Sequence, residues 1–165
     1  MNKNKKELKE RLKSYLECES ILNQVFERIN YCAENCRLMK EKDTNIGCCG
    51  NMFDFYEYFN GEDKSPRLAF LVKDRIKIYG KPNKTEDKCG YHSDSGCILK
   101  SHKSPICVTH CCSELKKYMG NKYSVIYHED YISDCFAKIV IGDFDNEFIE
   151  KFKKELEDIL GEVSV

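Results

Sequence analysis

The spacing of apolar residues predicts a long helix at each end of the chain. Within residues 5–40, apolar side chains recur at a period near 3.6, which is typical of an amphipathic helix. Residues 145–163 show the same spacing, and Asp145 before them is a residue type that favours the N-cap position. The two apolar stripes consist of Leu8, Leu12, Tyr15, Leu16, Leu22, Phe26, Ile29 and Ala33, and of Phe148, Ile149, Phe152, Leu156, Ile159 and Val163.

A third helix is predicted in the middle of the chain, over residues 65–80. Ser65 followed by Pro66 is a helix start signal, because serine caps the first turn and proline fits its first position. Gly80 is a stop signal, and the apolar residues between these limits fall on one helical face. Apolar and charged residues also alternate from Arg75 to Ile78, so a strand is the alternative for this part.

Between residues 109 and 141 the sequence predicts shorter elements than the long helices at the ends of the chain. Residues 109–119 predict a short helix capped by Thr109. Residues 123–128 and 135–141 are rich in β-branched and aromatic side chains, which predicts a β-hairpin. These elements together predict an α+β fold that is mostly helical, with a small C-terminal β-hairpin. We expect a single domain over residues 1–165.

Composition narrows the class of protein. With 165 residues, 41% hydrophobic and 33% charged, the chain is long enough to bury a core and is typical of a globular protein. A net charge of −1 provides no bulk attraction to nucleic acid or to an anionic membrane, so neither partner is expected. The sequence lacks both a run of about 18 apolar residues and the apolar region of a secretory signal, so we expect a cytoplasmic protein.

Cysteine is the residue type that points to chemistry. The chain has eleven cysteines, and an odd number in a reducing compartment favours metal ligands over a disulfide framework. Residues 89–112 contain five of these cysteines and three of the four histidines, and Cys48 and Cys49 form an adjacent pair upstream. Thiolates at this density are typical of zinc and iron–sulfur sites. Cys18 and Cys135 lie in apolar-periodic segments, where a thiol packs as a small hydrophobic group.

The spacing leaves the type of metal site open. Cys89 with His92, and Cys107 with His110, each form a C-x2-H pair, and two such pairs would suit a Cys2His2 zinc site. More than four thiolates would instead suit an iron–sulfur cluster or two metal ions. The sequence therefore predicts a metal-binding protein, with zinc or an iron–sulfur cluster as the cofactor.

The order of cysteines between residues 32 and 112 resembles the CxxCxxCC family, which is described as a zinc- or iron-chelating domain. The family shares its motif with bacterial flagellin lysine N-methylases. In this resemblance the first half of the motif corresponds to close-set cysteines ending in a CC pair, and the second half to a Gly-Cys followed by a cysteine ten residues later. Lys103 and Ser104 stand where that second half has Arg-Pro. The matching positions are Cys32, Cys36, Cys48 and Cys49, then Cys89, Gly96, Cys97 and Cys107, with Cys111 or Cys112 as the closing cysteine.

The resemblance implies a cysteine-rich, metal-stapled middle at about residues 32–112. It also implies an alternative function, a metal-dependent or iron–sulfur-dependent enzyme with methyltransferase-like or redox activity. Whether His92 and His110 join the ligands stays open. The predicted metal ligands are Cys32, Cys36, Cys48, Cys49, Cys89, Cys97, Cys107, Cys111 and Cys112.

Overall fold

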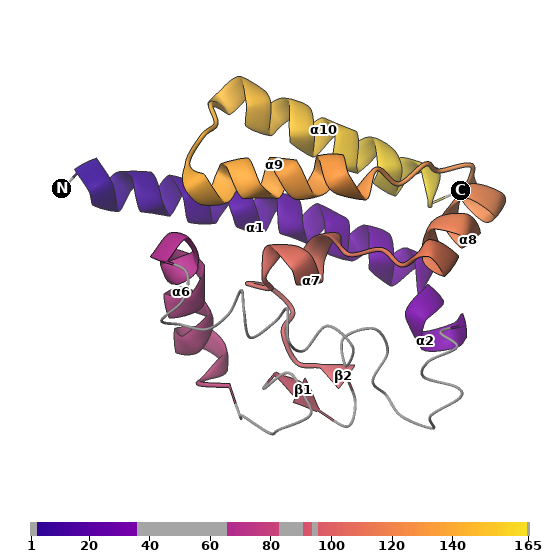
Figure 1. Ribbon diagram of the computed structural model, residues 1–165, viewed down its shortest axis with the longest axis horizontal. Helices are drawn as coiled ribbons and strands as arrows, with labels where there is room; N and C mark the ends of the chain where they lie inside the picture. Colours follow the sequence, from indigo (N-terminus) through magenta and orange to yellow (C-terminus); the bar gives the residue numbers. More distant parts are fainter. Residues whose placement is uncertain (1–2, 36–65, 83–90, 94–95, 165) are drawn as a thin grey trace. The chain divides into compact units, whose positions relative to one another are not determined.

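The computed structural model describes residues 3–35, 66–82, 91–93 and 96–164 (Figure 1). The chain divides into two compact units, which we call unit 1 and unit 2. Unit 1 comprises Met1–Ile29 together with Val108–Val165, and unit 2 comprises Asn30–Cys107. That residues 1–165 form a single domain remains a prediction, since this division does not test it. The four predicted ligands that lie outside the described residues are Cys36, Cys48, Cys49 and Cys89.

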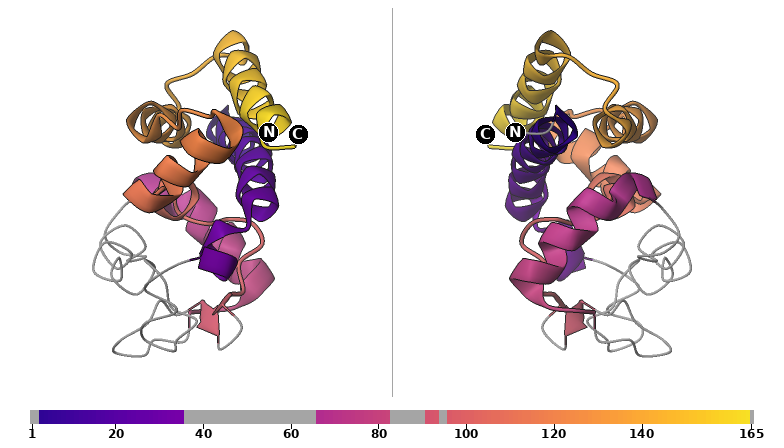
Figure 2. Two further views of the ribbon diagram at one scale, coloured as in Figure 1. Left: turned by 90° about the vertical axis from the view of Figure 1, so that its right-hand side faces the viewer. Right: turned by 90° about the vertical axis from the view of Figure 1, so that its left-hand side faces the viewer.

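Unit 1 contains four long helices. They are α1 (Lys3–Ile29), α8 (Ser113–Tyr123), α9 (Glu129–Ile141) and α10 (Asn146–Glu162). Helix α1 contacts both α9 and α10. Along their lengths α10 runs in the same direction as α1, and α9 runs in the opposite direction (Figure 1). The turned views of Figure 2 show these three helices close to end-on.

An aromatic cluster fills the core between these three helices. The ring centroids of Tyr15 in α1 and Phe136 in α9 lie 5.1 Å apart, and those of Phe136 and Phe152 in α10 lie 5.6 Å apart. Both pairs are edge-to-face, and all three side chains are buried. This geometry places the positive edge of one ring against the negative face of the next, which adds to the stabilisation from burial. One aromatic residue from each helix therefore joins the bundle.

The predicted C-terminal hairpin is wrong, and with it the α+β class. The stretch assigned to its second strand lies inside α9, whose buried residues follow a helical spacing of three and four. The first predicted strand does alternate in burial, since Val125 and Tyr127 are buried while Ile126 is 74% exposed. No partner strand pairs with it among the described residues, which are mostly helical. Residues buried in α9 are Ile132, Cys135, Phe136, Ile139 and Val140.

The helix boundaries refine the other predictions. Helix α10 begins as predicted, because the Asp145 side chain accepts a hydrogen bond from Phe148 N at 2.8 Å. The predicted first helix is interrupted at Asn30, whose φ of 47° is left-handed, and α2 (Tyr31–Asn35) follows it. Thr109 ends α7 (Pro105–Thr109) and does not cap the next helix, which Cys112 caps through its sulfur.

Unit 2 contains one long described helix, α6 (Ala69–Tyr79), preceded by the 3-10 turn η1 (Pro66–Leu68). The helix prediction for this segment is confirmed over the described residues, and the strand alternative is wrong. Helix α6 ends at Gly80, where a φ of 79° suits a residue without a Cβ. Two short strands, β1 (His92–Ser93) and β2 (Gly96–Cys97), pair antiparallel with His92 opposite Cys97.

A bilayer requires about 20 consecutive apolar residues in a spanning helix. Among the helices that the structure describes, none combines the length and the apolar character needed for this.

Candidate functional site

Unit 2 holds most of the predicted metal ligands. Its span contains seven of the eleven cysteines of the chain. Three of the seven lie in described residues, and all three are exposed: Cys32 in α2, Cys97 in β2 and Cys107 in α7. A cysteine that serves only packing is usually buried. Exposure at three positions is therefore unusual for purely structural thiols.

Three residues of the segment that joins Cys97 to Cys107 are buried, although its two terminal cysteines are exposed. Leu99 and Ser104 are buried, and His102 is only 4% exposed. Leu99 packs with Tyr91 in a small core. The inner residues of the segment are thus fixed in unit 2 while the flanking cysteines stay accessible.

The buried side chain of Arg75 in α6 binds the backbone of the Cys97–Cys107 segment. Arg75 is 2% exposed, and its Nε atom donates a hydrogen bond to the carbonyl oxygen of His102 at 2.6 Å. The guanidinium carbon lies 5.7 Å from the centroid of the Tyr91 ring, which is a cation–π distance. A buried charge is tolerated only where it is well hydrogen-bonded, and such charge-assisted bonds are stronger than neutral ones. Arg75 therefore ties the middle of the segment to α6.

Tyr79, at the C-terminal end of α6, binds the same segment through its hydroxyl group. The hydroxyl oxygen accepts hydrogen bonds from the backbone N–H groups of Lys100, at 3.2 Å, and Ser101, at 3.0 Å. It also lies 3.1 Å from the Ser101 hydroxyl oxygen. Because residues 98–104 form neither helix nor strand, this side chain supplies a partner for two backbone donors that regular structure would otherwise supply.

His102 links the segment to α6 at a second point. Its Nε2 atom lies 3.2 Å from Oδ2 of Asp74, and its Nδ1 atom lies 2.8 Å from the hydroxyl oxygen of Ser101. Burial lowers the pKa of His102 below its ordinary value of 6.5, and the hydrogen bond to Asp74 opposes this shift only in part. His102 is therefore neutral in the folded protein near pH 7.

The neutral state of His102 fixes the direction of each hydrogen bond in the series that runs from Asp74 through His102 and Ser101 to Tyr79. A carboxylate can only accept, so His102 Nε2 donates to Asp74. The second ring nitrogen of a neutral imidazole must then accept, and the Ser101 hydroxyl donates to it. The Tyr79 hydroxyl in turn donates to the Ser101 oxygen, while its own oxygen accepts from the two backbone N–H groups. The side chains of Asp74, His102, Ser101 and Tyr79 thus have mutually consistent donor and acceptor roles.

Cys107 is placed by Ser104, which is fully buried. The backbone N–H of Cys107 donates to the Ser104 carbonyl oxygen at 2.9 Å, which starts α7. The Cys107 sulfur also lies 3.8 Å from the Ser104 hydroxyl oxygen. Ser104 thus supplies polar contacts to a predicted ligand.

The cysteines of unit 1 have different surroundings. Cys111 is buried, and its thiol points to the Met119 sulfur at 4.0 Å. The Cys112 sulfur accepts a hydrogen bond from Leu115 N at 3.5 Å and so caps α8. Both sulfurs contribute to the packing or capping of unit 1, which distinguishes them from the exposed cysteines of unit 2.

His110 and its neighbours also interact within unit 1. Its Nδ1 atom lies 3.2 Å from Oε1 of Glu129, and Lys116 Nζ lies 2.6 Å from Oε2 of the same carboxylate. Burial alone would raise the pKa of Glu129, but the hydrogen bonds and charge interactions with Lys116 and His110 together outweigh burial and lower that pKa below its ordinary value. The carboxylate of Glu129 therefore stays charged and holds both side chains.

Cys18 and Cys135 are buried, as their apolar-periodic settings predict. Burial raises the pKa of the Cys18 thiol to about 12, and burial also raises the pKa of Cys135. Because the thiolate is the form that binds metal, a thiol with a raised pKa is a poor ligand.

No group of three or more histidine, cysteine, aspartate or glutamate side chains that could hold a metal ion lies within the described residues. Cys97 and Cys107 would need partners to complete a site. The four predicted ligands that could supply them, Cys36, Cys48, Cys49 and Cys89, lie outside the residues that the structure describes.

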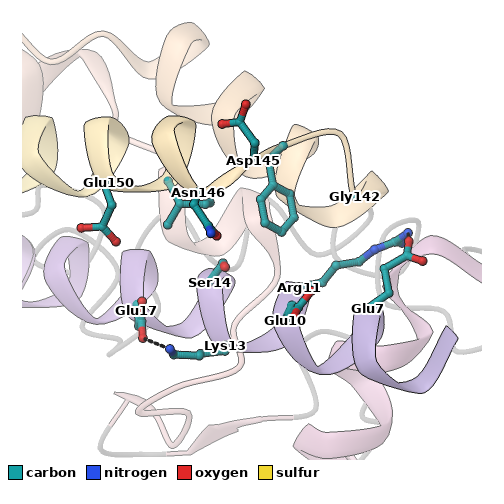
Figure 3. A pocket seen from close by; sticks show the side chains of 12 residues that line it. Glu7, Glu10, Arg11, Lys13, Ser14, Glu17, Gly142, Asp145, Asn146 and Glu150 are labelled. Atoms are coloured by element: carbon teal, nitrogen blue, oxygen red, sulfur yellow. Dashed lines mark hydrogen bonds and ion pairs between the residues drawn. The ribbon is translucent and has the colours of Figure 1, made fainter. Parts of the chain in front are cut away.

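Unit 1 has a cavity of about 320 Å³ between α1 and the start of α10 (Figure 3). Asn146 of α10 and Ser14 of α1 point towards each other there. Its charged side chains pair locally, as in the ion pair of Lys13 with Glu17 at 3.6 Å. The described residues that line it include neither cysteine nor histidine, so this cavity offers no thiolate or imidazole ligand.

Sequence reasoning missed the three residues of α6 that hold the Cys97–Cys107 segment, Asp74, Arg75 and Tyr79, and also His102, to which two of them bind. One signal existed for Arg75, which lies four positions after Leu71 and three after Val72 and so falls on the apolar face of its helix. A charged residue on a buried face is rarely incidental. The contacts of Tyr79 and His102 depend on loop geometry, and the sequence carries no periodic signal for them.

Comparisons with protein-family models, with curated proteins and with solved structures found no match to this chain.

Proposed function

We propose that this protein binds a metal through cysteine thiolates of unit 2, as a zinc site or as an iron–sulfur cluster. The observation that carries the proposal is the contrast between exposed and buried cysteines. Cys97 and Cys107 are exposed at the two ends of a segment that has three buried residues and is hydrogen-bonded to α6. Cys18 and Cys135 are buried with raised pKa values. A chain that uses its thiols only for packing has no reason to maintain this difference.

The ligand set follows from the span of unit 2. Unit 2 contains the cysteine pattern that resembles the CxxCxxCC family from Cys32 to Cys107, without the closing cysteine, and this resemblance supports thiolate coordination by zinc or iron. Cys111 and Cys112 are secondary candidates, because their sulfurs already have contacts in unit 1. The proposed ligands are therefore Cys32, Cys36, Cys48, Cys49, Cys89, Cys97 and Cys107.

Metal analysis of protein purified without oxygen tests the proposal and separates its two forms. A colourless protein with stoichiometric zinc would identify a zinc site. Visible absorbance at about 400 nm with stoichiometric iron and sulfide would identify a cluster. Protein that contains neither metal, and takes up neither when it is reconstituted under reducing conditions, would contradict the proposal.

Substitutions then test the ligands. Cys97→Ala and Cys107→Ala should each lower the metal content. Cys135→Ala is the matched control, since it removes a thiol from a buried position in unit 1 and should leave the metal content unchanged. Equal metal content in all three variants would contradict this assignment of Cys97 and Cys107.

A further inference from the structure

We propose that α6 is a positioning element for metal binding, and that Tyr79 and Asp74 hold the Cys97–Cys107 segment in the conformation that binds metal. This inference rests on the proposed function, because it assigns a role to residues around the same site. Neither residue is a metal ligand in the proposal. Both act through the backbone and the imidazole of the segment that carries two ligands.

The first argument is that the segment has no regular structure of its own. Residues 98–104 lie between β2 and α7 and belong to neither. Fixing the backbone of one residue costs about 1–2 kcal/mol of conformational entropy. If metal binding had to order the segment, this entropy loss would lower the metal affinity. Contacts that order the segment before the metal binds avoid that loss of affinity.

The second argument is that α6 contacts the segment at three successive residues. The Tyr79 hydroxyl binds the N–H groups of Lys100 and Ser101, and Arg75 binds the carbonyl of His102. Asp74 binds the His102 ring. Backbone groups on both sides of the Ser101–His102 peptide are thus fixed by one helix, which leaves little freedom for the chain between the two cysteines.

The third argument is the strained backbone at His102. Its φ of 63° lies in the left-handed region, which is unfavourable for a residue with a Cβ. Such a conformation persists only where the surroundings determine it strongly, and it is common at functional sites. The contacts from Asp74 and Arg75 hold His102 from its ring and from its carbonyl, and so keep the turn that precedes Cys107.

The Tyr79→Phe variant tests this role with the loss of one oxygen atom. The aromatic ring stays, but two backbone N–H groups and the Ser101 hydroxyl lose a partner. We expect the affinity of the metal-free, reduced protein for Co²⁺, a probe of tetrahedral thiolate sites, to fall about 10- to 100-fold, as for other residues that orient metal ligands. The thiolate-to-cobalt absorption per bound ion should also change, because the geometry of the ligands is altered.

Tyr131→Phe is the matched control. Its hydroxyl group binds Glu155 at the surface of unit 1, and its loss should leave Co²⁺ affinity and absorption unchanged. Asp74→Ala is a second test that keeps the fold, since Asp74 is partly exposed and alanine favours a helix. We expect it to weaken Co²⁺ binding, whereas Lys73→Ala, at an exposed position on the same helix, should not.

The outcomes separate the two proposals. If the wild-type protein binds no Co²⁺, both the proposed function and this inference fail. If the wild type binds Co²⁺ and both Tyr79→Phe and Asp74→Ala bind it equally well, the positioning role fails and metal binding stands. Weaker binding and altered absorption in variants that retain the wild-type circular dichroism of the metal-free state support positioning, because a general loss of structure would change that spectrum.

Discussion

The Nε atom of the buried Arg75 lies 2.6 Å from the carbonyl oxygen of His102, and this one hydrogen bond joins α6 to a loop 27 residues away in the chain. The contact between His102 Nε2 and Asp74 Oδ2 joins the same helix and loop across 28 residues. The Arg75 bond is charge-assisted and short, and the strained backbone of His102 depends on it. Together with the contacts of Asp74 and Tyr79, it determines where the loop lies on the helix.

Replacing Arg75 with methionine should destabilise the protein by about 1–3 kcal/mol. Methionine fills a similar space but has no donor, so the His102 carbonyl would stay buried without its hydrogen bond. The free energy of unfolding from urea titration measures the effect. Arg67→Met is the control, because Arg67 is exposed in η1 and its loss should change stability by less than about 0.5 kcal/mol. Equal stability of the two variants would contradict the anchoring role of Arg75.

His102 should make stability depend on pH. Its pKa is lower in the folded protein than its ordinary value of 6.5, so the unfolded chain binds the proton more readily. Stability should be highest above pH 6.5, fall as pH decreases through 6.5, and level off below the folded pKa. Asp74 and Arg75 are the charged groups facing the ring, and burial exceeds the opposing effect of Asp74.

Urea titrations of the metal-free protein between pH 5 and 8 measure this dependence. His102→Asn is the informative variant, because asparagine tolerates a left-handed backbone and does not titrate in this range. We expect a flatter profile between pH 5 and 7 in the variant than in the wild type. Identical profiles would show that another group is responsible.

The contrast between α9 and α10 shows how far the fold could be predicted. In α10 the apolar stripe, the Asp145 cap and the polar face all indicate a helix, and the structure agrees. In α9 the β-branched and aromatic residues favour a strand by composition, while their spacing favours a helix. A helix allows Phe136 to pack against both Tyr15 and Phe152. The helical spacing of the apolar residues therefore outweighs their intrinsic preference for strands.

For the candidate site, sequence reasoning identified the candidate cysteines but not the residues that hold them in place. The cysteine pattern selects Cys97 and Cys107, and their exposure adds to that prediction without testing it. Tyr79 and Ser101 are 22 residues apart, and their contact depends on a loop of irregular backbone. Such a contact follows from tertiary packing, which local periodicity does not encode.

An alanine at Gly142, in the turn between α9 and α10, should be unfavourable. The φ of 80° at Gly142 is left-handed and strained for a residue with a Cβ, and the added Cβ would also displace the Arg11 guanidinium of α1. Gly142→Ala should therefore destabilise unit 1 by about 1–3 kcal/mol. Gly161→Ala is the matched control, since that glycine lies in α10 with open space around it and alanine should stabilise the helix by up to about 1 kcal/mol. Thermal unfolding of both variants measures the difference. A Gly142→Ala variant that is as stable as the wild type would contradict the predicted strain.

Removal of the proposed metal should destabilise unit 2 before unit 1. A thiolate site rarely forms in an unfolded chain, so metal binding contributes folding energy, on the order of 10 kcal/mol for a zinc-type site. The Tyr15–Phe136–Phe152 cluster of unit 1 needs no metal for its packing.

Hydrogen exchange measured before and after chelation at neutral pH separates the two responses. We expect faster exchange at the amides of Lys100 and Ser101, which the Tyr79 hydroxyl binds, and unchanged exchange in the middle of α1 and α10. The Cys107→Ala variant should show the fast exchange before any chelator is added, because a proposed ligand is missing. Protein that contained metal, lost all of it to the chelator and kept slow exchange at both amides would contradict a stabilising role for the metal. Faster exchange that spread equally through α1 and α10 would instead show that the two units unfold together.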